Sequence, residues 1–147
     1  MSYETDTVIR LETNLDDLSP ELIGAVMERL LKAGALDVWF TPIQMKKNRP
    51  GTMLSVLCEE PGVNELTDII FAETTAFGLR KETVQRIKLA RRFETVKTPY
   101  GDVTVKLGLK GDTIVQRTPE FESCRVVAEK SGRSIREIYL AAQNARA

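Results

Sequence analysis

The stretch ETNLDDLSPE, residues 12–21, gathers carboxylates where a predicted strand passes into a predicted helix. Glu12, Asn14, Asp16 and Asp17 offer the oxygen ligands that hard divalent cations such as Mg²⁺ and Mn²⁺ prefer. Acidic residues before a helix also complement its dipole and bond its free N–H groups. The adjacency of Asp16 and Asp17 favours a metal role slightly, because a cap needs only one carboxylate. Both interpretations stay open.

A second group of residues, MKKNRPGT at positions 45–52, is strongly basic. Lys46, Lys47 and Arg49 place three cations within four positions, and Gly51 lets a backbone approach a ligand closely. Arginine grips phosphate in a bidentate way, and lysine adds a point charge. The loop is not a Walker A motif, since GxxxxGK[ST] is absent from the sequence. It predicts a triphosphate site, with plain solvation of a basic hairpin loop as the alternative.

A weaker cluster, ETTAFGLRKE, spans residues 73–82 and contains Arg80. Thr74 and Thr75 add hydroxyls that could contact an anion. The alternative is a helix end closed by Gly78, where cations suit the negative end of the dipole.

Composition limits the classes of function. The 147 residues carry 21 basic and 21 acidic side chains, so no global field draws the chain to nucleic acid or membrane. No apolar run is long enough to span a bilayer, and the first residues lack a signal pattern, so we expect a cytoplasmic protein. Histidine is absent, and two isolated cysteines indicate neither a disulfide framework nor a CxxC zinc site.

Hydrophobic periodicity predicts how these groups are positioned. Strands are expected at residues 7–13, 35–45, 52–60 and 79–90, and helices at 20–34 and 63–74. Pro42 assigns its strand to a sheet edge or a bulge. The order β-α-β-β-α-β is the ferredoxin-like pattern of an α+β fold, an antiparallel sheet with both helices on one face. In this fold the acidic turn and the basic loop need not adjoin within one subunit, and they could meet across a subunit interface.

The remaining residues predict a different piece of structure. A β-hairpin at 92–109 turns at Pro99–Asp102, and a further strand follows at 112–117. Two helices close the chain, one ended by Gly132 and the other capped by Ser134 with Glu137 in a capping box. We therefore expect a ferredoxin-like subdomain at residues 1–91 and a β-hairpin and two-helix appendage at 92–147.

Several stretches together resemble a known family. They are ETNLDDLSPE, MERLLKAGALDVWFTPIQMKKNRPGT, TTAFGLR, VKTPYGDVTVK and PEFESCRVVAEKSGRSIREIY, and they cover nearly the whole chain. The chain is similar to the C-terminal domain of the LarC family, the nickel-insertion proteins of lactate racemase maturation. The resemblance implies a CTP-dependent cyclometallase, a lyase that inserts nickel into a pyridinium bis-thiocarboxylate mononucleotide. It also implies a divalent ion such as Mn²⁺ or Mg²⁺ with the CTP, and a homo-oligomer.

Transferred to this sequence, the resemblance makes Asp16 and Asp17, helped by Glu12 and Asn14, candidates for the nucleotide-bound ion. It makes Lys46, Lys47 and Arg49 candidates for triphosphate contacts, with Arg80 a weaker one. Family members carry a histidine-rich N-terminal domain that this sequence does not include. We therefore expect a separate N-terminal domain to handle nickel, and we expect Cys58 to be a buried core thiol.

A non-catalytic reading competes with this one. The chain could be a regulatory or assembly module that binds a small anionic effector at a subunit interface, because ferredoxin-like folds serve many functions. Dependence on metal separates the two, since a simple anion site tolerates a chelator. Nucleic-acid binding is disfavoured by the balanced charge and by the lack of a basic face interleaved with aromatic residues.

Overall fold

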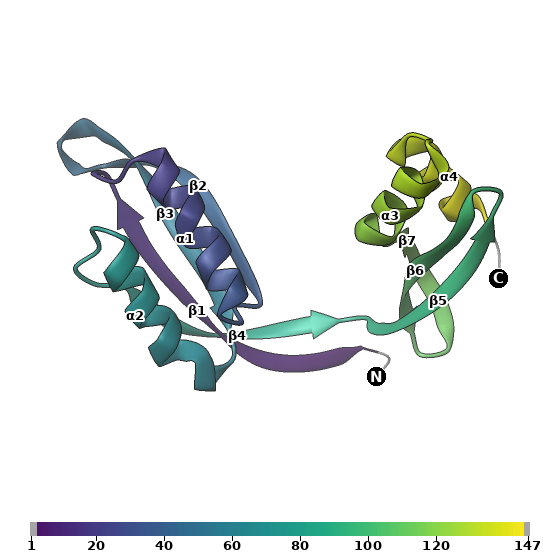
Figure 1. Ribbon diagram of the computed structural model, residues 1–147. Coiled ribbons are helices and arrows are strands. Elements are labelled where there is room, and N and C mark those ends of the chain that lie inside the picture. The colour runs from purple at the N-terminus through teal and green to yellow at the C-terminus, as the bar shows by residue number, and fades with distance from the viewer. Residues whose placement is uncertain (1–2, 146–147) are drawn as a thin grey trace. The chain divides into compact units, whose positions relative to one another are not determined.

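The computed structural model describes residues 3–145, so the first and last two residues of the predicted domain ranges lie outside it (Figure 1). The chain forms two compact units, and each is described by itself. The first unit is Asp6–Arg86. The second unit combines two stretches of the chain, the N-terminal residues up to Thr5 and the residues from Ile87 onward. Over residues 3–145 the structure confirms a mixed α+β protein with antiparallel sheets and four α-helices.

The first unit is built on a four-stranded sheet in the order β2-β3-β1-β4. Its elements are β1 (Glu4–Leu15), α1 (Pro20–Lys32), β2 (Asp37–Met45), a 3₁₀ turn (Lys46–Asn48), β3 (Arg49–Cys58), a second 3₁₀ turn (Glu60–Gly62), α2 (Val63–Glu73) and β4 (Arg80–Lys88). Strands β1 and β2 both run antiparallel to β3, and α1 and α2 lie on one face of the sheet (Figure 1). Strand β2 is an edge strand, as Pro42 predicts.

The core of this unit explains which side chains are left for a site. Leu11, Thr13 and Leu15 of β1 are buried on the face that α1 and α2 cover. Because strand side chains alternate between faces, Glu12 and Asn14 point to the opposite, helix-free face. The core is completed by apolar side chains of the other elements, namely Val26, Leu30, Val38, Leu54, Val56, Cys58, Leu66, Ile69 and Ile70.

The predicted helix ends are largely confirmed. Helix α1 starts at Pro20 with Ser19 as its N-cap residue, although the Ser19 side chain makes no capping hydrogen bond. Gly34, with φ of 96°, lies just beyond its end. The alternative that Gly78 closes α2 is wrong: α2 ends at Glu73, and the Thr74 hydroxyl donates to the carbonyl oxygen of Ile70 at 2.6 Å.

The second unit pairs a three-stranded antiparallel sheet with two helices. The sheet order is β5-β6-β7, so the third predicted strand joins the hairpin. The elements are β5 (Ala90–Thr98), β6 (Gly101–Lys110), β7 (Thr113–Pro119), α3 (Phe121–Ser131) and α4 (Ile135–Asn144). The predicted capping box of α4 is present, since Glu137 N donates to Ser134 Oγ at 3.2 Å and Ser134 N donates to Glu137 Oε2 at 3.1 Å.

In residues 3–145 we find no helix with the length and apolar character needed to cross a membrane.

Candidate functional site

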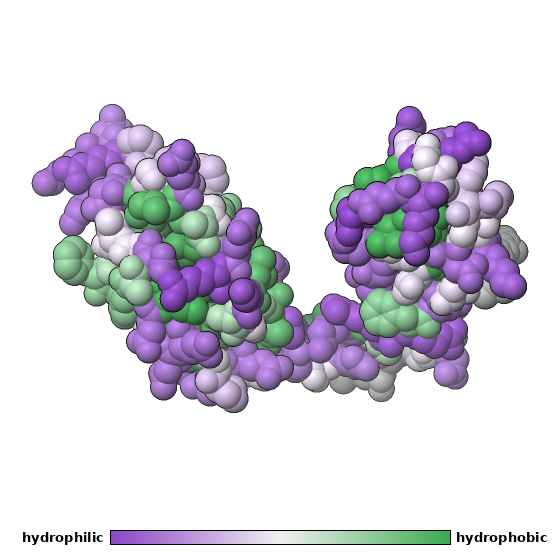
Figure 2. Space-filling model, viewed as in Figure 1, coloured by the Kyte–Doolittle hydropathy of each residue, from purple (hydrophilic) through white to green (hydrophobic). Residues whose placement is uncertain are grey.

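The pairing of β1 with β3 brings the acidic turn and the basic loop together within one chain. Leu15 pairs with Thr52, and Arg49 begins β3 directly after the loop. The end of β1 therefore lies against the start of β3, and Arg49 Nη1 lies 3.4 Å from Asp16 Oδ2. No second subunit is needed for this contact. The end of the first unit that carries the β2–β3 loop has a strongly hydrophilic surface (Figure 2).

A hollow of about 480 Å³ opens beside this contact. Three of the predicted site residues, Asn14, Lys46 and Arg80, line it. The rest of the wall is formed by Ile43, Gln44, Met45 and Met53. Two cationic side chains thus share a recess with two amides and three apolar side chains, and its volume falls within the range of small-molecule sites. Such a recess can hold an anion that also has an apolar part.

Arg80 is held at the hollow by β1. Its Nη2 donates to Asn14 Oδ1 at 2.9 Å and lies 3.8 Å from Glu12 Oε2. It also lies 3.6 Å from the Met53 sulfur. Arg80 is the first residue of β4, and its side chain is about half exposed, at 49%. It keeps donors available for a ligand while its position is set by the sheet.

Glu12 anchors the charged side chains beneath the hollow. Its side chain is only 14% exposed and accepts a hydrogen bond from Ser55 Oγ at 3.4 Å. Arg10 Nε lies 3.3 Å away in an ion pair without hydrogen-bond geometry, while Arg10 Nη2 donates to Glu82. The Glu82 hydrogen bond, helped by the charge of Glu12, raises the pKa of Arg10. Glu12 and Asn14 thus both contact Arg80.

The two adjacent aspartates contact different neighbours. Asp16 reaches Arg49, whereas Asp17 Oδ1 accepts a hydrogen bond from Thr75 Oγ1 in the loop between α2 and β4. Within the described part of the chain, neither carboxylate accepts a hydrogen bond from the first turn of α1. These bonds therefore do not support the capping interpretation. The turn at Asp16 and Asp17 instead contacts the start of β3 and the loop between α2 and β4.

The basic loop adopts a backbone conformation that is uncommon outside glycine. Lys47 and Asn48 have φ of 60° and 58°, in the left-handed region. Asn48 tolerates this conformation, and its Oδ1 accepts a hydrogen bond from Gln44 Nε2 at 2.9 Å. Lys47 adopts the left-handed conformation at an energetic cost. Backbone held in such regions gathers at binding sites. Lys46 and Lys47 consequently stand at the tip of a tight, defined loop.

The residues present fit an open divalent site better than a closed one. Across residues 3–145 we find no group of three or more His, Cys, Asp or Glu side chains placed to hold a metal ion. Asp16 and Asp17 offer two carboxylates, and Mg²⁺ typically takes one or two carboxylates with substrate phosphates and water. A divalent ion here would take the rest of its shell from phosphate oxygens and water.

Cys58 is confirmed as a core residue, and Cys124 is buried as well. Cys58 and Cys124 are 1% and 0% exposed, and burial raises the pKa of both thiols. Cysteine binds metal ions as the thiolate, and burial disfavours that form of both side chains.

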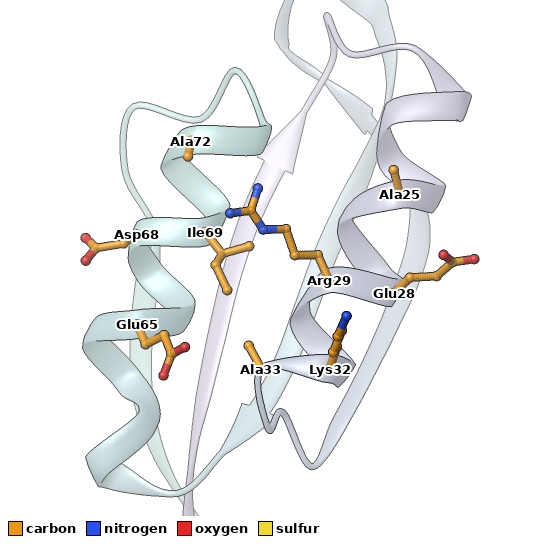
Figure 3. A pocket seen from close by; sticks show the side chains of 9 residues that line it. All are labelled: Ala25, Glu28, Arg29, Lys32, Ala33, Glu65, Asp68, Ile69 and Ala72. Atoms are coloured by element: carbon orange, nitrogen blue, oxygen red, sulfur yellow. The ribbon is translucent and has the colours of Figure 1, made fainter.

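A larger hollow of about 1040 Å³ lies elsewhere, between α1 and α2. Figure 3 shows the Arg29 side chain reaching from α1 toward Ile69 on α2, and Ala33 between Lys32 and Glu65. Arg29 is already paired with Glu73. The wall is open and of mixed sign, and it contains none of the predicted site residues, so it presents no convergent set of groups for one ligand.

Several neighbours of the site were not predicted. Thr75 was only a weak candidate, and Arg10, Ser55 and Met53 were not singled out. The alternation of β3 places Met53 and Ser55 on the helix-free face and could have revealed them. Nothing in the local sequence signals the contact of Arg10 with Glu82, because the two residues lie far apart in the chain and meet only where β4 lies beside β1.

The fold and the site define a class: a small α+β domain that sets a basic loop and an anion-sized hollow beside a pair of carboxylates. Residues 1–139 match the family model described as nickel insertion protein, and the chain belongs to that family. It therefore belongs with the proteins that the sequence motifs indicate.

Named relatives support this assignment. The chain is 50% identical over 129 residues to the pyridinium-3,5-bisthiocarboxylic acid mononucleotide nickel insertion protein of Clostridium kluyveri. It is 44% identical over 133 residues to the protein of the same name from a Thermotoga species. These alignments cover 88% and 90% of this chain but 32% and 33% of the relatives. The chain thus spans about a third of the length of these curated relatives.

Solved structures agree. The chain is similar to LarC2, the C-terminal domain of a cyclometallase involved in the synthesis of the NPN cofactor of lactate racemase, in its apo form. The TM-score is 0.88 and the identity 46%, over 95% of this chain and 96% of that one. A protein from Methanopyrus kandleri AV19 matches with a TM-score of 0.68 and 26% identity, over 95% of this chain and 88% of that one.

Proposed function

We propose that this domain binds CTP with Mn²⁺ or Mg²⁺ and thereby serves the insertion of nickel into pyridinium-3,5-bisthiocarboxylic acid mononucleotide. The observation that carries the proposal is the β1–β3 register, because it sets Asp16 against Arg49 beside the hollow that Lys46 and Arg80 line. The names of the relatives supply the reaction and its substrate. The proposal extends to a ferredoxin-like first unit, a cytoplasmic location and a homo-oligomer.

The cationic side chains bind the triphosphate. Lys46 and Arg80 face the hollow, and Lys47 stands at the exposed tip of the loop. Arg49 exchanges its Asp16 partner for phosphate. The cost of that exchange is small, because an exposed ion pair is worth about 0–1 kcal/mol, whereas a charge-assisted hydrogen bond to phosphate is stronger.

The carboxylates serve the divalent ion. Once Arg49 has turned to phosphate, Asp16 is open to the ion, and Asp17 lies next to it in the chain with Thr75 as its partner. Glu12 and Asn14 support the site by fixing Arg80. A bound Mn²⁺ or Mg²⁺ supplies charge neutralisation for phosphate chemistry. Nickel is cargo in this scheme, and its ligands come from a separate N-terminal domain, because both thiols here are buried.

The test is a calorimetric titration of the chain with CTP, ATP, GTP and UTP, each with Mn²⁺ and again with EDTA. We expect CTP to bind with Mn²⁺ and the heat to disappear with EDTA. Binding that persists in EDTA would favour the alternative, a regulatory anion site. An absence of binding by all four nucleotides contradicts the proposal for this domain.

The variant Asp16→Asn/Asp17→Asn tests the metal role. We expect it to lose Mn²⁺-dependent CTP binding while it remains folded, since only an exposed ion pair and one side-chain hydrogen bond are removed. Glu65→Gln/Asp68→Asn on α2 is the matched control, because it removes the same charge from the hollow that Figure 3 shows. Equal CTP affinity in the parent and a folded Asp16→Asn/Asp17→Asn variant would exclude these ligands.

A further inference from the structure

The second unit has its own hollow, on the sheet face that its helices leave uncovered. Helices α3 and α4 pack on one face of β5-β6-β7, against Val96, Val103, Val105 and Leu107 (Figure 1). Two cross-strand pairs, Phe93–Lys106 and Arg91–Gly108, lie on the other face, because residues in a strand alternate between faces.

The register brings chemically useful side chains into two neighbouring rows on that face. Phe93, Lys106 and Thr118 form one row across the three strands, and Arg91, Gly108 and Gln116 form the next. A hollow of about 280 Å³ opens over these rows. It is lined by Ile87, Lys88, Leu89, Arg91, Lys106, Leu107, Gly108, Gln116 and Thr118.

Gly108 marks a close approach on this face. A Cβ atom there would lie 2.8 Å from Leu89 Cδ1 and 3.1 Å from Gln116 Cβ, so a larger residue would displace its neighbours. A register irregularity in the β6–β7 pairing follows at Gly108 and Leu109. Glycines inside strands and irregularities of this kind recur where a ligand or another segment comes close to the backbone.

The lining is cationic and partly apolar. Lys88, Arg91 and Lys106 are basic, and no acidic residue lines the hollow in the described part of the chain. Lys106 Nζ forms an ion pair with Glu120 Oε1 at 3.3 Å, and the Lys106 side chain is 43% exposed. Because an exposed ion pair contributes little free energy, Lys106 can leave it for a ligand at little cost. Ile87 and Phe93 are 76% and 58% exposed, so this face also carries apolar surface that solvent can reach. Thr118 and Gln116 add hydrogen-bonding groups.

We infer that this hollow binds a small planar organic anion, a single aromatic ring that carries carboxylate-type groups. Its volume lies at or just below the lower end of the roughly 300–1,000 Å³ usual for ligand pockets, so it suits one ring rather than a nucleoside triphosphate. Arg91 and Lys106 contact the anionic groups, while Ile87 and Leu89, the aliphatic side chains of the wall, contact the ring. The identity of the ligand rests on the proposed function. If that function holds, the ligand is the pyridinium ring of the mononucleotide that receives nickel, and this ring binds at a different place from the CTP triphosphate.

The test follows backbone amide resonances of the full chain as pyridine-3,5-dicarboxylate is added without divalent ions. We expect the amides of Gly108, Gln116 and Thr118 to shift, and those of Asp16 and Arg49 to stay. Acetate at the same concentration is the control for a simple carboxylate, and we expect it to leave the amides in place. Equal shifts with acetate, or no shift at the three amides in the millimolar range, overturn the inference.

A charge-removing variant sharpens the result. Arg91→Gln/Lys106→Gln loses two charge-assisted contacts, and since one such contact is worth about tenfold in affinity, we expect binding to weaken at least about tenfold. Lys97→Gln/Lys130→Gln removes the same charge outside the hollow and should change affinity by less than about twofold. Unchanged affinity in a folded Arg91→Gln/Lys106→Gln protein refutes the site.

Titration of the same sample with Mn²⁺ and CTP separates the two proposals. CTP binding without dicarboxylate binding overturns the second site alone. Dicarboxylate binding without CTP binding overturns the proposed function and leaves the planar-anion site standing.

Discussion

Arg80→Gln is the most informative single substitution in the first unit. The Arg80 guanidinium lines the hollow and is held by Asn14 at 2.9 Å and Glu12 at 3.8 Å. If it contacts phosphate, its loss removes a charge-assisted interaction worth about 1.5–3 kcal/mol. At about 1.4 kcal/mol for each factor of ten, the Kd for CTP with Mn²⁺ should rise roughly 10- to 150-fold.

The same substitution should barely affect the free energy of unfolding. The Arg80 side chain is 49% exposed, and its ion pair with Glu12 is a long one, so we expect a cost below about 1 kcal/mol. Glu12 also keeps its neighbours Arg10 and Ser55. A urea titration followed by circular dichroism measures this cost.

Arg29→Gln is the matched control for Arg80→Gln. Arg29 is similarly exposed, at 56%, and is paired with Glu73 beside the hollow between the helices. Isothermal calorimetry should find its CTP affinity equal to that of the parent. The reasoning fails if Arg80→Gln binds as tightly as the parent. It also fails if the two variants lose affinity equally, because the effect would then come from net charge.

Four further outcomes are expected. Gly51→Ala should lower the free energy of unfolding by about 1–3 kcal/mol in urea titrations, since its Cβ would lie 2.7 Å from Met45 Sδ and 2.8 Å from the Leu15 carbonyl oxygen; wild-type stability would contradict that packing. Ser134→Ala should cost about 0.5–2 kcal/mol through loss of the α4 cap. The Ser134 backbone N–H holds the pKa of Glu137 below its ordinary 4.5. Ionised Glu137 therefore stabilises the folded state above pH 4.5, and this contribution is lost as the pH falls through the lower pKa of the folded state. The difference in free energy of unfolding between the parent and Glu137→Gln should shrink in acid. Both buried cysteines should resist iodoacetamide in the native protein and react in denaturant, as mass spectrometry would show.

Much of the fold followed from local patterns in the sequence. Helical periodicity predicted α1 and α2, and alternation predicted the strands. Pro42 predicted an edge strand because it lacks the donor that a central strand needs, and the Ser134–Glu137 spacing predicted a capping box. Element ends were less accurate. Strand β3 begins at Arg49 rather than at residue 52, since the connection from β2 is a turn of only three residues.

Residue types alone predicted which side chains could bind an ion or a phosphate, because carboxylates and guanidinium groups have fixed chemistry. Their neighbours depended on the tertiary structure. The pairing of β1 with β3 sets Asp16 against Arg49, and the place of β4 beside β1 directs Glu12 and Asn14 toward Arg80. Strand register joins residues far apart in the chain, and a shift of one residue would turn every side chain to the other face. The sequence thus determined the groups available for chemistry, and only the sheet decided which of them meet.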